Sequence, residues 1–307
     1  MVTAPKPPIS IHTRAALLML GSTAFFALMV ITIRLASESL HTFEIAFFRS
    51  FFGMLAALPL LLKHGPGLLR TQQMPRYIVR CVLGTLSMFC GFWAISHLPL
   101  AQAVSLSYST PLFVTIAAVL WLGEQVRVRR WSAVILGFIG VLVIVRPGTT
   151  EFSAASLVAV TAAIISGIVA IQIKQLAYTE PADRIVILTT ILWVPLSLLP
   201  ALWVWEWPHG IVWLWVVLAG VLGTGGHMLW TRALKLGEVS ALVPISFMQL
   251  PIVVVFGYFL FGEALDRWTL LGAAIIFSAN GYIAHREASL ARRAASTAPT
   301  SAAKPGN

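Results

Sequence analysis

Apolar runs of about helix length, separated by short polar segments, fill most of this chain. A helix that spans a bilayer needs about 20 mostly apolar residues, so each run is long enough for one crossing. The segments between the runs are too short to form a soluble domain. The pattern predicts ten transmembrane helices, near residues 15–35, 43–63, 76–96, 100–121, 131–146, 154–176, 184–206, 211–230, 239–261 and 268–285.

The composition agrees with a membrane protein. The chain is 58% hydrophobic and 10% charged, whereas an ordinary soluble domain is roughly 25% charged. A net charge of +10 would suggest a nucleic-acid partner for a soluble protein. Here the basic residues lie between the apolar runs, where they act as topology signals. We therefore expect the lipid bilayer as a partner, no nucleic acid, and an all-α fold in the inner (plasma) membrane.

Two segments of the chain have similar sequences. PLFVTIAAVLWLGE at 111–124 is repeated as PIVVVFGYFLFGE at 251–263, and the Gly-Glu pairs that end them are 139 positions apart (263 minus 124). The tetrapeptide VLGT at 82–85 recurs at 221–224 with the same spacing. Apolar helices resemble one another by composition, so a chance repeat is the alternative. We favour a true repeat of five helices.

The charges predict how the two copies are oriented. Most of the 21 lysines and arginines fall in the tails and in alternate loops, which places both termini in the cytoplasm by the positive-inside rule. Five helices is an odd number, so the second copy must be inverted in the membrane. The expected parts are a disordered N-tail (1–13), a first repeat (14–146), an inverted second repeat (147–286) and a disordered C-tail (287–307).

Arg49 is the clearest charged residue inside a predicted helix. A charge at a helix centre costs about 2.5–3.5 kcal/mol on insertion scales, so such residues are functional candidates. The counterpart of Arg49 in the second copy is Thr189, which means that the architecture does not require an arginine. Two interpretations remain open: contact with an anion or carboxylate of the substrate, or a side chain that snorkels to the membrane interface.

Three ring side chains are weaker candidates. His227, in the eighth helix, would bind substrate or carry a proton, or simply be satisfied by a neighbouring carbonyl. Trp93 and Trp230 lie near the ends of the third and eighth helices, where they would either wall a cavity or anchor the helices at the interface.

The fourth and ninth helices hold the densest polarity within the predicted membrane region. Hydroxyl and amide side chains there suit a small polar substrate. These substrate-binding candidates are Gln102, Ser107 and Tyr108 in the fourth helix and Ser246 and Gln249 in the ninth.

Prolines interrupt the same two helices. Pro111, Pro244 and Pro251 are candidates for kinks or gating, because a mid-helix proline frees the carbonyl four residues earlier, which is that of Ser107 or Phe247. Freed carbonyls within a membrane are tolerated where they line a cavity. A kink that serves packing alone is the alternative.

Helix ends and glycines favour structural roles. In the inverted arrangement Glu124 and Glu263 lie at opposite membrane faces, so a substrate role for both is implausible, and we expect them to end helices and pair with basic groups. Six glycines are expected to allow close helix packing, although the cluster in the eighth helix also suits a hinge. They are Gly84, Gly91, Gly220, Gly223, Gly225 and Gly226.

With the inverted repeat, the segment FEIAFFRSFFG around Arg49 and two helices that run from proline to Gly-Glu, the chain resembles the drug/metabolite transporter superfamily in its EamA-type branch. The resemblance covers about residues 14–286. It implies a secondary carrier that works by alternating access, with a central cavity lined by helices 1, 3, 4, 6, 8 and 9. Arg49, on helix 2, falls outside that lining. Members carry amino acids, riboflavin, S-adenosylmethionine and other metabolites, so a small polar organic substrate is expected.

Other classes of membrane protein remain as alternatives. A membrane enzyme or lipid-handling protein would need clustered His, Asp or Glu within its helices, but here the acids lie in loops or at helix ends, with Glu44 the nearest to the membrane interior. A non-transporting assembly subunit would not need prolines in both halves. We therefore expect no enzyme activity, cofactor or metal, and proton coupling would have to use Glu44, His227 or the substrate itself.

Overall fold

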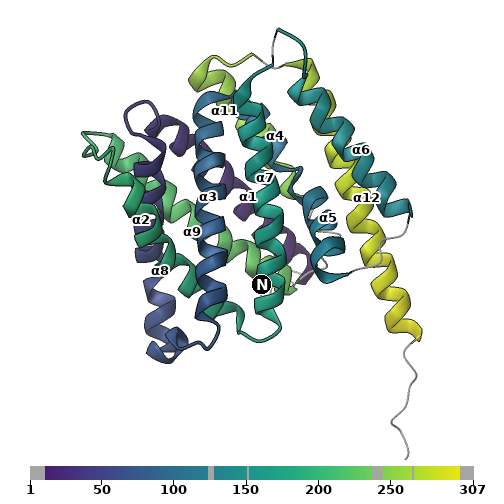
Figure 1. The fold of residues 1–307 in the computed structure, drawn as a ribbon, viewed down its shortest axis with the longest axis horizontal. Coiled ribbons are helices and arrows are strands. Elements are labelled where there is room, and N and C mark those ends of the chain that lie inside the picture. The colour runs from purple at the N-terminus through teal and green to yellow at the C-terminus, as the bar shows by residue number, and fades with distance from the viewer. Residues whose placement is uncertain are drawn as a thin grey trace, which may run out of the picture.

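The computed structural model describes residues 11–123, 128–150, 152–236, 242, 245–264 and 266–297. All regular secondary structure in these stretches is helical (Figure 1). The helices are α1 (Ile11–Ala36), α2 (Thr42–His64), η1 (Pro66–Leu69), α3 (Met74–His97), α4 (Leu100–Ser107), α5 (Thr110–Leu122), α6 (Val128–Val145), α7 (Ala154–Ala177), α8 (Ala182–Ala201), α9 (Val212–Leu236), α11 (Gln249–Phe261) and α12 (Arg267–Thr297).

Seven helices in the described part of the chain are long and apolar enough to cross a membrane, counting α4 and α5 as one run. Two shorter apolar helices, Trp131–Val145 and Gln249–Phe261, accompany them. The expected all-α membrane fold is confirmed at this level, whereas the count of ten spans stays a prediction.

Helices from the two halves of the sequence pack against each other throughout. α1 packs along α9, α3 along α7, and α2 against both α8 and α9. Figure 1 shows α2 and α8 at one end of the molecule and α6 beside α12 at the other. The remaining long helices lie between these two pairs, so neither half of the chain forms a separate body.

The expected fourth helix is broken in two. α4 ends at Ser107 and α5 begins at Thr110, just before Pro111, which has no backbone N–H to continue the ladder. The Ser107 carbonyl accepts a hydrogen bond from the Thr110 hydroxyl at 2.8 Å. The helix is therefore interrupted just before this proline, and the carbonyl that was expected to be free already has a donor.

A similar break precedes α11. Residues 247 and 248 form a turn, and the Phe247 carbonyl accepts from the backbone N–H of Leu250 at 3.1 Å. Pro251 then lies in the first turn of α11, where a missing N–H costs little. Pro244 lies outside the described residues.

The glycines of α9 permit close contact with α1 and α2. A Cβ on Gly220 would lie 2.6 Å from the Cβ of Phe52 and 2.8 Å from the backbone nitrogen of Gly53, and one on Gly225 would meet the ring of Phe25. The Ser22 hydroxyl also donates to the carbonyl of Gly226 at 2.8 Å. The interpretation of these glycines as packing positions is confirmed.

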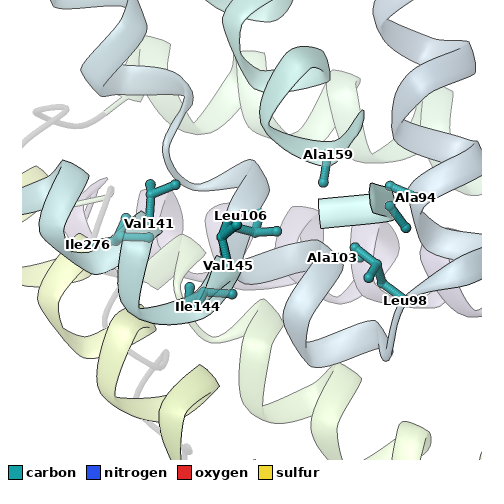
Figure 2. Close-up of a cluster of buried hydrophobic side chains, with 10 residues drawn as sticks. Ala94, Leu98, Ala103, Leu106, Val141, Ile144, Val145, Ala159 and Ile276 are labelled. Atoms are coloured by element: carbon teal, nitrogen blue, oxygen red, sulfur yellow. The ribbon is translucent and has the colours of Figure 1, made fainter. Parts of the chain in front are cut away.

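An apolar cluster joins α6 and α12 to the centre of the bundle (Figure 2). It combines side chains of α3, α4, α6, α7 and α12 that are all buried. They are Ala94, Leu98, Ala103, Leu106, Val141, Ile144, Val145, Ala155, Ala159 and Ile276.

Several helix ends differ from the sequence prediction, among them the end of α9, which lies at Leu236 rather than near 230. α8 ends at Ala201 rather than near 206, and the backbone N–H of Glu206 is bound outside the helix by the carboxylate of Glu44. α12 continues to Thr297, beyond residue 286, where the second repeat was expected to end. The outermost parts of both tails lie outside the described residues.

Candidate functional site

A cavity of about 550 Å³ lies within the bundle, between helices of the first half and helices of the second. Its wall is built by α1, α2, α3, α4 and α5 together with α7, α8, α9 and α11. Its polar and charged lining residues are Arg49, Arg80, Ser87, Ser107, Thr110, Ser166, Trp193, His227 and Gln249.

Small residues on α3 and α7 leave the space open. Ala162 and Ala163 on α7 face the cavity, as do Gly84 and Gly91 on α3. Near them Ser87 and Ser166 share a hydrogen bond of 2.7 Å, and Ser87 also donates to the carbonyl of Ala162 at 2.9 Å. The two helices are thus held together by hydroxyl groups while their small side chains keep the cavity wide.

Arg49 lies on α2 and lines the cavity with only 8% of its surface exposed. Its Nη1 atom lies 3.8 Å from the sulfur of Met88. A Cβ on Gly223 would lie 3.0 Å from its Nη2, so the glycine makes room for the guanidinium. The Arg49 side chain is therefore directed into the bundle rather than towards the interface, although helix 2 was not expected in the cavity lining.

Arg80 is a second buried arginine, with 7% of its surface exposed. It was not among the candidates from the sequence, because it lies close to the expected start of the third helix, where its charge fits the topology pattern. α3 begins at Met74, which places Arg80 inside the helix and against the cavity. Its Nη1 donates to the hydroxyl of Thr189 and lies 3.8 Å from the sulfur of Cys81.

Trp193 of α8 lies beside both arginines. The guanidinium carbon of Arg49 is 5.4 Å from the centre of the Trp193 ring, and that of Arg80 is 5.9 Å away. These are cation–π distances. The indole Nε1 has no hydrogen-bond partner among the described residues, and it would lie 3.2 Å from a Cβ on Gly84.

Other candidates proposed from the sequence also line the cavity. His227 packs edge-on against the ring of Phe26, with ring centres 5.0 Å apart. Ser107, whose hydroxyl donates to the carbonyl of Val104 at 2.7 Å, and Gln249 lie at the two helix breaks. The structure therefore brings Arg49, His227, Ser107 and Gln249 to one cavity.

Tyr108 joins the two helix breaks beside the cavity. Its hydroxyl donates to the carbonyl of Ser246 at 2.7 Å and lies 3.3 Å from Oε1 of Gln249. Its own carbonyl accepts from Nδ2 of Asn280 at 2.7 Å. Of these residues only Gln249 lines the cavity, so Tyr108 and Ser246 lie in contact with the site rather than in its wall.

Three further candidates lie away from the cavity wall. Gln102 donates to the hydroxyl of Ser156 at 3.1 Å. Trp93 stacks on His97, with ring centres 4.0 Å apart. Trp230 packs in the apolar cluster around Met19, where α1 meets α9.

Comparison with known proteins gives the family. The family model described as "EamA-like transporter family" matches residues 13–146 and again residues 153–283. The chain belongs to the EamA-like transporter family. The resemblance to the drug/metabolite transporter superfamily is thereby confirmed, and this EamA-like chain is a multi-pass membrane protein of a transporter family.

Its relatives are named as carriers of small metabolites. The chain is 32% identical to an S-adenosylmethionine uptake transporter of Rickettsia felis, over 81% of this chain and 84% of the relative. It is 33% identical to a riboflavin transporter of Vibrio cholerae, over 73% of this chain and 76% of the relative. A pseudopaline exporter of Pseudomonas aeruginosa is 28% identical over 82% and 89%.

One solved crystal structure has the same fold as this EamA-like chain. The two are 21% identical in sequence and superpose with a TM-score of 0.63, over 91% of this chain and 98% of the other. At this identity the likeness supports the helical arrangement alone.

Two of the acidic residues that the sequence singled out, Glu44 and Glu263, lie at helix ends of this EamA-like chain. Both oxygens of Glu44 accept backbone hydrogen bonds, Oε2 from His41 at 2.8 Å and Oε1 from Glu206. Glu263 accepts from the backbone N–H of Leu100 at 2.7 Å, and burial raises the pKa of its carboxyl while that N–H and Arg34 oppose the rise. Glu124 lies outside the described residues.

Proposed function

We propose that this protein is a secondary transporter that moves a small polar organic metabolite across the inner membrane by alternating access. The observation that carries the proposal is the cavity, whose wall contains charged and polar groups buried inside an otherwise apolar bundle. Polar groups at membrane depth are tolerated where they line a cavity, and ionisable ones there are functional candidates.

The helix breaks support a moving cavity wall. α4–α5 and the segment before α11 are interrupted beside the cavity, one in each half of the chain, and broken helices at the contact of two repeats are typical of transporter binding sites. Tyr108 links the two breaks through Ser246. We propose that the halves 14–146 and 147–286 form inverted repeats of five helices, with ten spans and both termini in the cytoplasm.

The names of the relatives favour a substrate of the cofactor type. S-adenosylmethionine and riboflavin are both organic molecules larger than a single amino acid, and the cavity of about 550 Å³ offers room for a ligand of this class. We propose such a substrate, and a carrier rather than an enzyme. The relatives include both uptake transporters and an exporter, so the proposal leaves the direction open.

If transport is coupled to protons, we propose that His227 rather than Glu44 binds the transported proton. It lies in the cavity wall, whereas both oxygens of Glu44 are occupied by backbone N–H groups at the end of α2. A His227→Gln variant should then lose the dependence of transport on a pH gradient while keeping counterflow.

Uptake by the purified protein in liposomes tests the proposed function. We expect saturable accumulation of radiolabelled S-adenosylmethionine or riboflavin, accelerated by the unlabelled compound on the other side of the membrane. Absence of counterflow for both compounds and for a wider metabolite mixture would refute the proposal that the protein is a transporter. Tags on both termini should be accessible only from the cytoplasm, and a periplasmic C-terminus would exclude the ten-span arrangement.

A further inference from the structure

We propose that Arg49, Arg80 and Trp193 form a carboxylate-binding site in the cavity, and hence that the transported substrate is an organic carboxylate. The inference rests on the proposed transport function, because it names the class of substrate that the cavity accepts. All three residues line the cavity, and they come from three different helices, α2, α3 and α8.

The two arginines leave an imbalance of charge in the cavity wall. Arginine stays protonated in proteins, and Arg49 and Arg80 are each more than nine-tenths buried. In the described part of the chain neither arginine forms an ion pair with a carboxylate. Two buried positive charges within a membrane are costly, so an anion that binds in the cavity beside them is stabilised.

The same three residues also have a surplus of hydrogen-bond donors. The Nε atoms of both arginines and the Nε1 atom of Trp193 are buried and have no acceptor among the described residues. All three are N–H groups that can only donate. A ligand that satisfies them must therefore bring acceptor oxygens, and a carboxylate, with two coplanar oxygens, suits the planar guanidinium group.

Neighbouring side chains hold these donors in place. Arg80 is fixed by its hydrogen bond to Thr189. The guanidinium of Arg49 lies beside the Met88 sulfur and fits against Gly223, which has no side chain. The Trp193 ring lies within cation–π distance of both guanidinium groups, which helps to hold two like charges near each other. The site is thus largely formed before the ligand arrives.

The rest of the cavity indicates an organic ligand rather than an inorganic anion. The volume of about 550 Å³ exceeds what one small ion fills, and much of the remaining wall is apolar, including Phe26, Phe92 and the alanines of α7. A carboxylate group at the arginines with an apolar or aromatic body against this wall would use both parts of the lining.

The other half of the sequence shows that the architecture does not demand this cluster. At the spacing of 140 positions that relates Arg49 to Thr189 (189 minus 49), the counterpart of Trp193 is Gly53 (193 minus 53). Gly53 lies in tight contact, since its carbonyl accepts from Thr224 at 3.0 Å and a Cβ there would lie 2.8 Å from the same hydroxyl. The counterparts of Arg49 and Trp193 are therefore a threonine and a glycine, so the repeated architecture requires neither the guanidinium nor the indole.

The test measures ligand-induced thermal stabilisation of the purified full-length protein with matched probes. The pairs are nicotinate against nicotinamide and indole-3-acetate against indole-3-acetamide, with sodium phosphate and sodium chloride as inorganic anions. We expect a carboxylate to bind at least about tenfold more tightly than its uncharged partner. Arg49→Gln and Arg80→Gln should each weaken that binding about tenfold or more, and Arg70→Gln, at an exposed loop position, should not.

Further variants separate loss of the site from loss of the fold. Arg49→Lys and Arg80→Lys keep the charge but lose the fork of donors, so they should bind carboxylates with intermediate affinity, and Trp193→Phe should lose only the indole donor. Equal binding of acid and amide, full affinity in both glutamine variants, a response to inorganic anions alone, or no response to any carboxylate would each overturn the proposal.

The same variants distinguish this inference from the transport function. If liposomes take up riboflavin, which has no carboxylate, and Arg49→Gln and Arg80→Gln leave the rate unchanged, the transporter stands and the carboxylate site is refuted. If carboxylates bind in an arginine-dependent way but nothing is transported, the site stands and the transport proposal fails.

Discussion

The side-chain carboxylate of Glu263 accepts a hydrogen bond of 2.7 Å from the backbone N–H of Leu100, a residue 163 positions away in the chain. The bond joins the end of α11 to the first residue of α4. Arg34 of α1 lies 3.8 Å from the same carboxylate and donates to the carbonyl of Ile95 at 2.8 Å. One acidic side chain thus contacts three helices, and its structural role stays a prediction that variants of Glu263 test.

Replacing Glu263 should therefore lower stability. Glu263→Ala removes the acceptor for a helix N-terminal N–H, and we expect a loss of about 1–3 kcal/mol, whereas Glu263→Gln keeps an acceptor oxygen and should lose less. Thermal unfolding of the purified protein checks the order. Equal melting temperatures for wild type and Glu263→Ala would show that the hydrogen bond contributes little.

Packing of α9 against α2 should be intolerant of a single methyl group. A Cβ on Gly220 would overlap the Cβ of Phe52 and the backbone of Gly53, so Gly220→Ala should destabilise the protein by about 1–3 kcal/mol through overpacking. Gly281→Ala is the matched control, because nothing lies within 4 Å of its added Cβ inside α12. That variant should be neutral or gain up to about 1 kcal/mol from helix propensity. The prediction fails if both variants unfold at the same temperature.

The sequence alone indicates close packing at glycines and some residues of the site, because a single unusual residue in an apolar run is enough to reveal each of them. A glycine in an apolar run, or Arg49 in FEIAFFRSFFG, departs visibly from its surroundings. Trp193 gives no comparable signal, since a tryptophan in an apolar run is compatible with core, lipid or cavity. Arg80 is hidden by its position near a helix start, where its charge also fits the topology pattern. Which of these side chains meet depends on packing between distant helices, and that relationship has no local trace.

Residues at the helix breaks should differ in their access to water. In a background of Cys81→Ala and Cys90→Ala, we expect Gln249→Cys to react rapidly with a small charged thiol reagent, because Gln249 lines the cavity. Gln102→Cys should react more slowly, since Gln102 is engaged with Ser156 outside the cavity wall. Protection of position 249 by a transported compound would link the cavity to transport. Equal labelling of both positions would contradict this assignment of the wall.

Acidity should weaken the contact between the loop before α3 and the loop before α8. Burial would raise the pKa of Glu180, but hydrogen bonds from Thr71 at 2.5 Å and Arg184 at 2.6 Å, and the charge of Arg184, outweigh it, so the pKa is lowered. A carboxyl group whose pKa is lowered in the folded state stabilises the fold fully at pH values above its unfolded-state pKa of about 4.3. That stabilisation is lost as the pH falls through the folded-state pKa. The melting temperature of wild type should therefore exceed that of Glu180→Gln at pH 7, and the gap should narrow towards pH 3. A gap that is constant with pH would exclude this role.

The hydroxyl of Tyr108 should influence transport through the helix breaks rather than through substrate contact. It donates to the carbonyl of Ser246 at 2.7 Å, so Tyr108→Phe leaves that carbonyl without this donor and should cost about 1–2 kcal/mol. Because Tyr108 itself does not line the cavity, the KM of the variant for a transported compound should stay within about twofold of the wild-type KM. The maximal rate of transport should change, because the break between α4 and α5 is no longer linked to the break before α11. Tyr258→Phe, at an exposed position of α11, is the control and should alter neither quantity. A raised KM with an unchanged rate would instead place the Tyr108 hydroxyl in the binding site, where the sequence alone had put it.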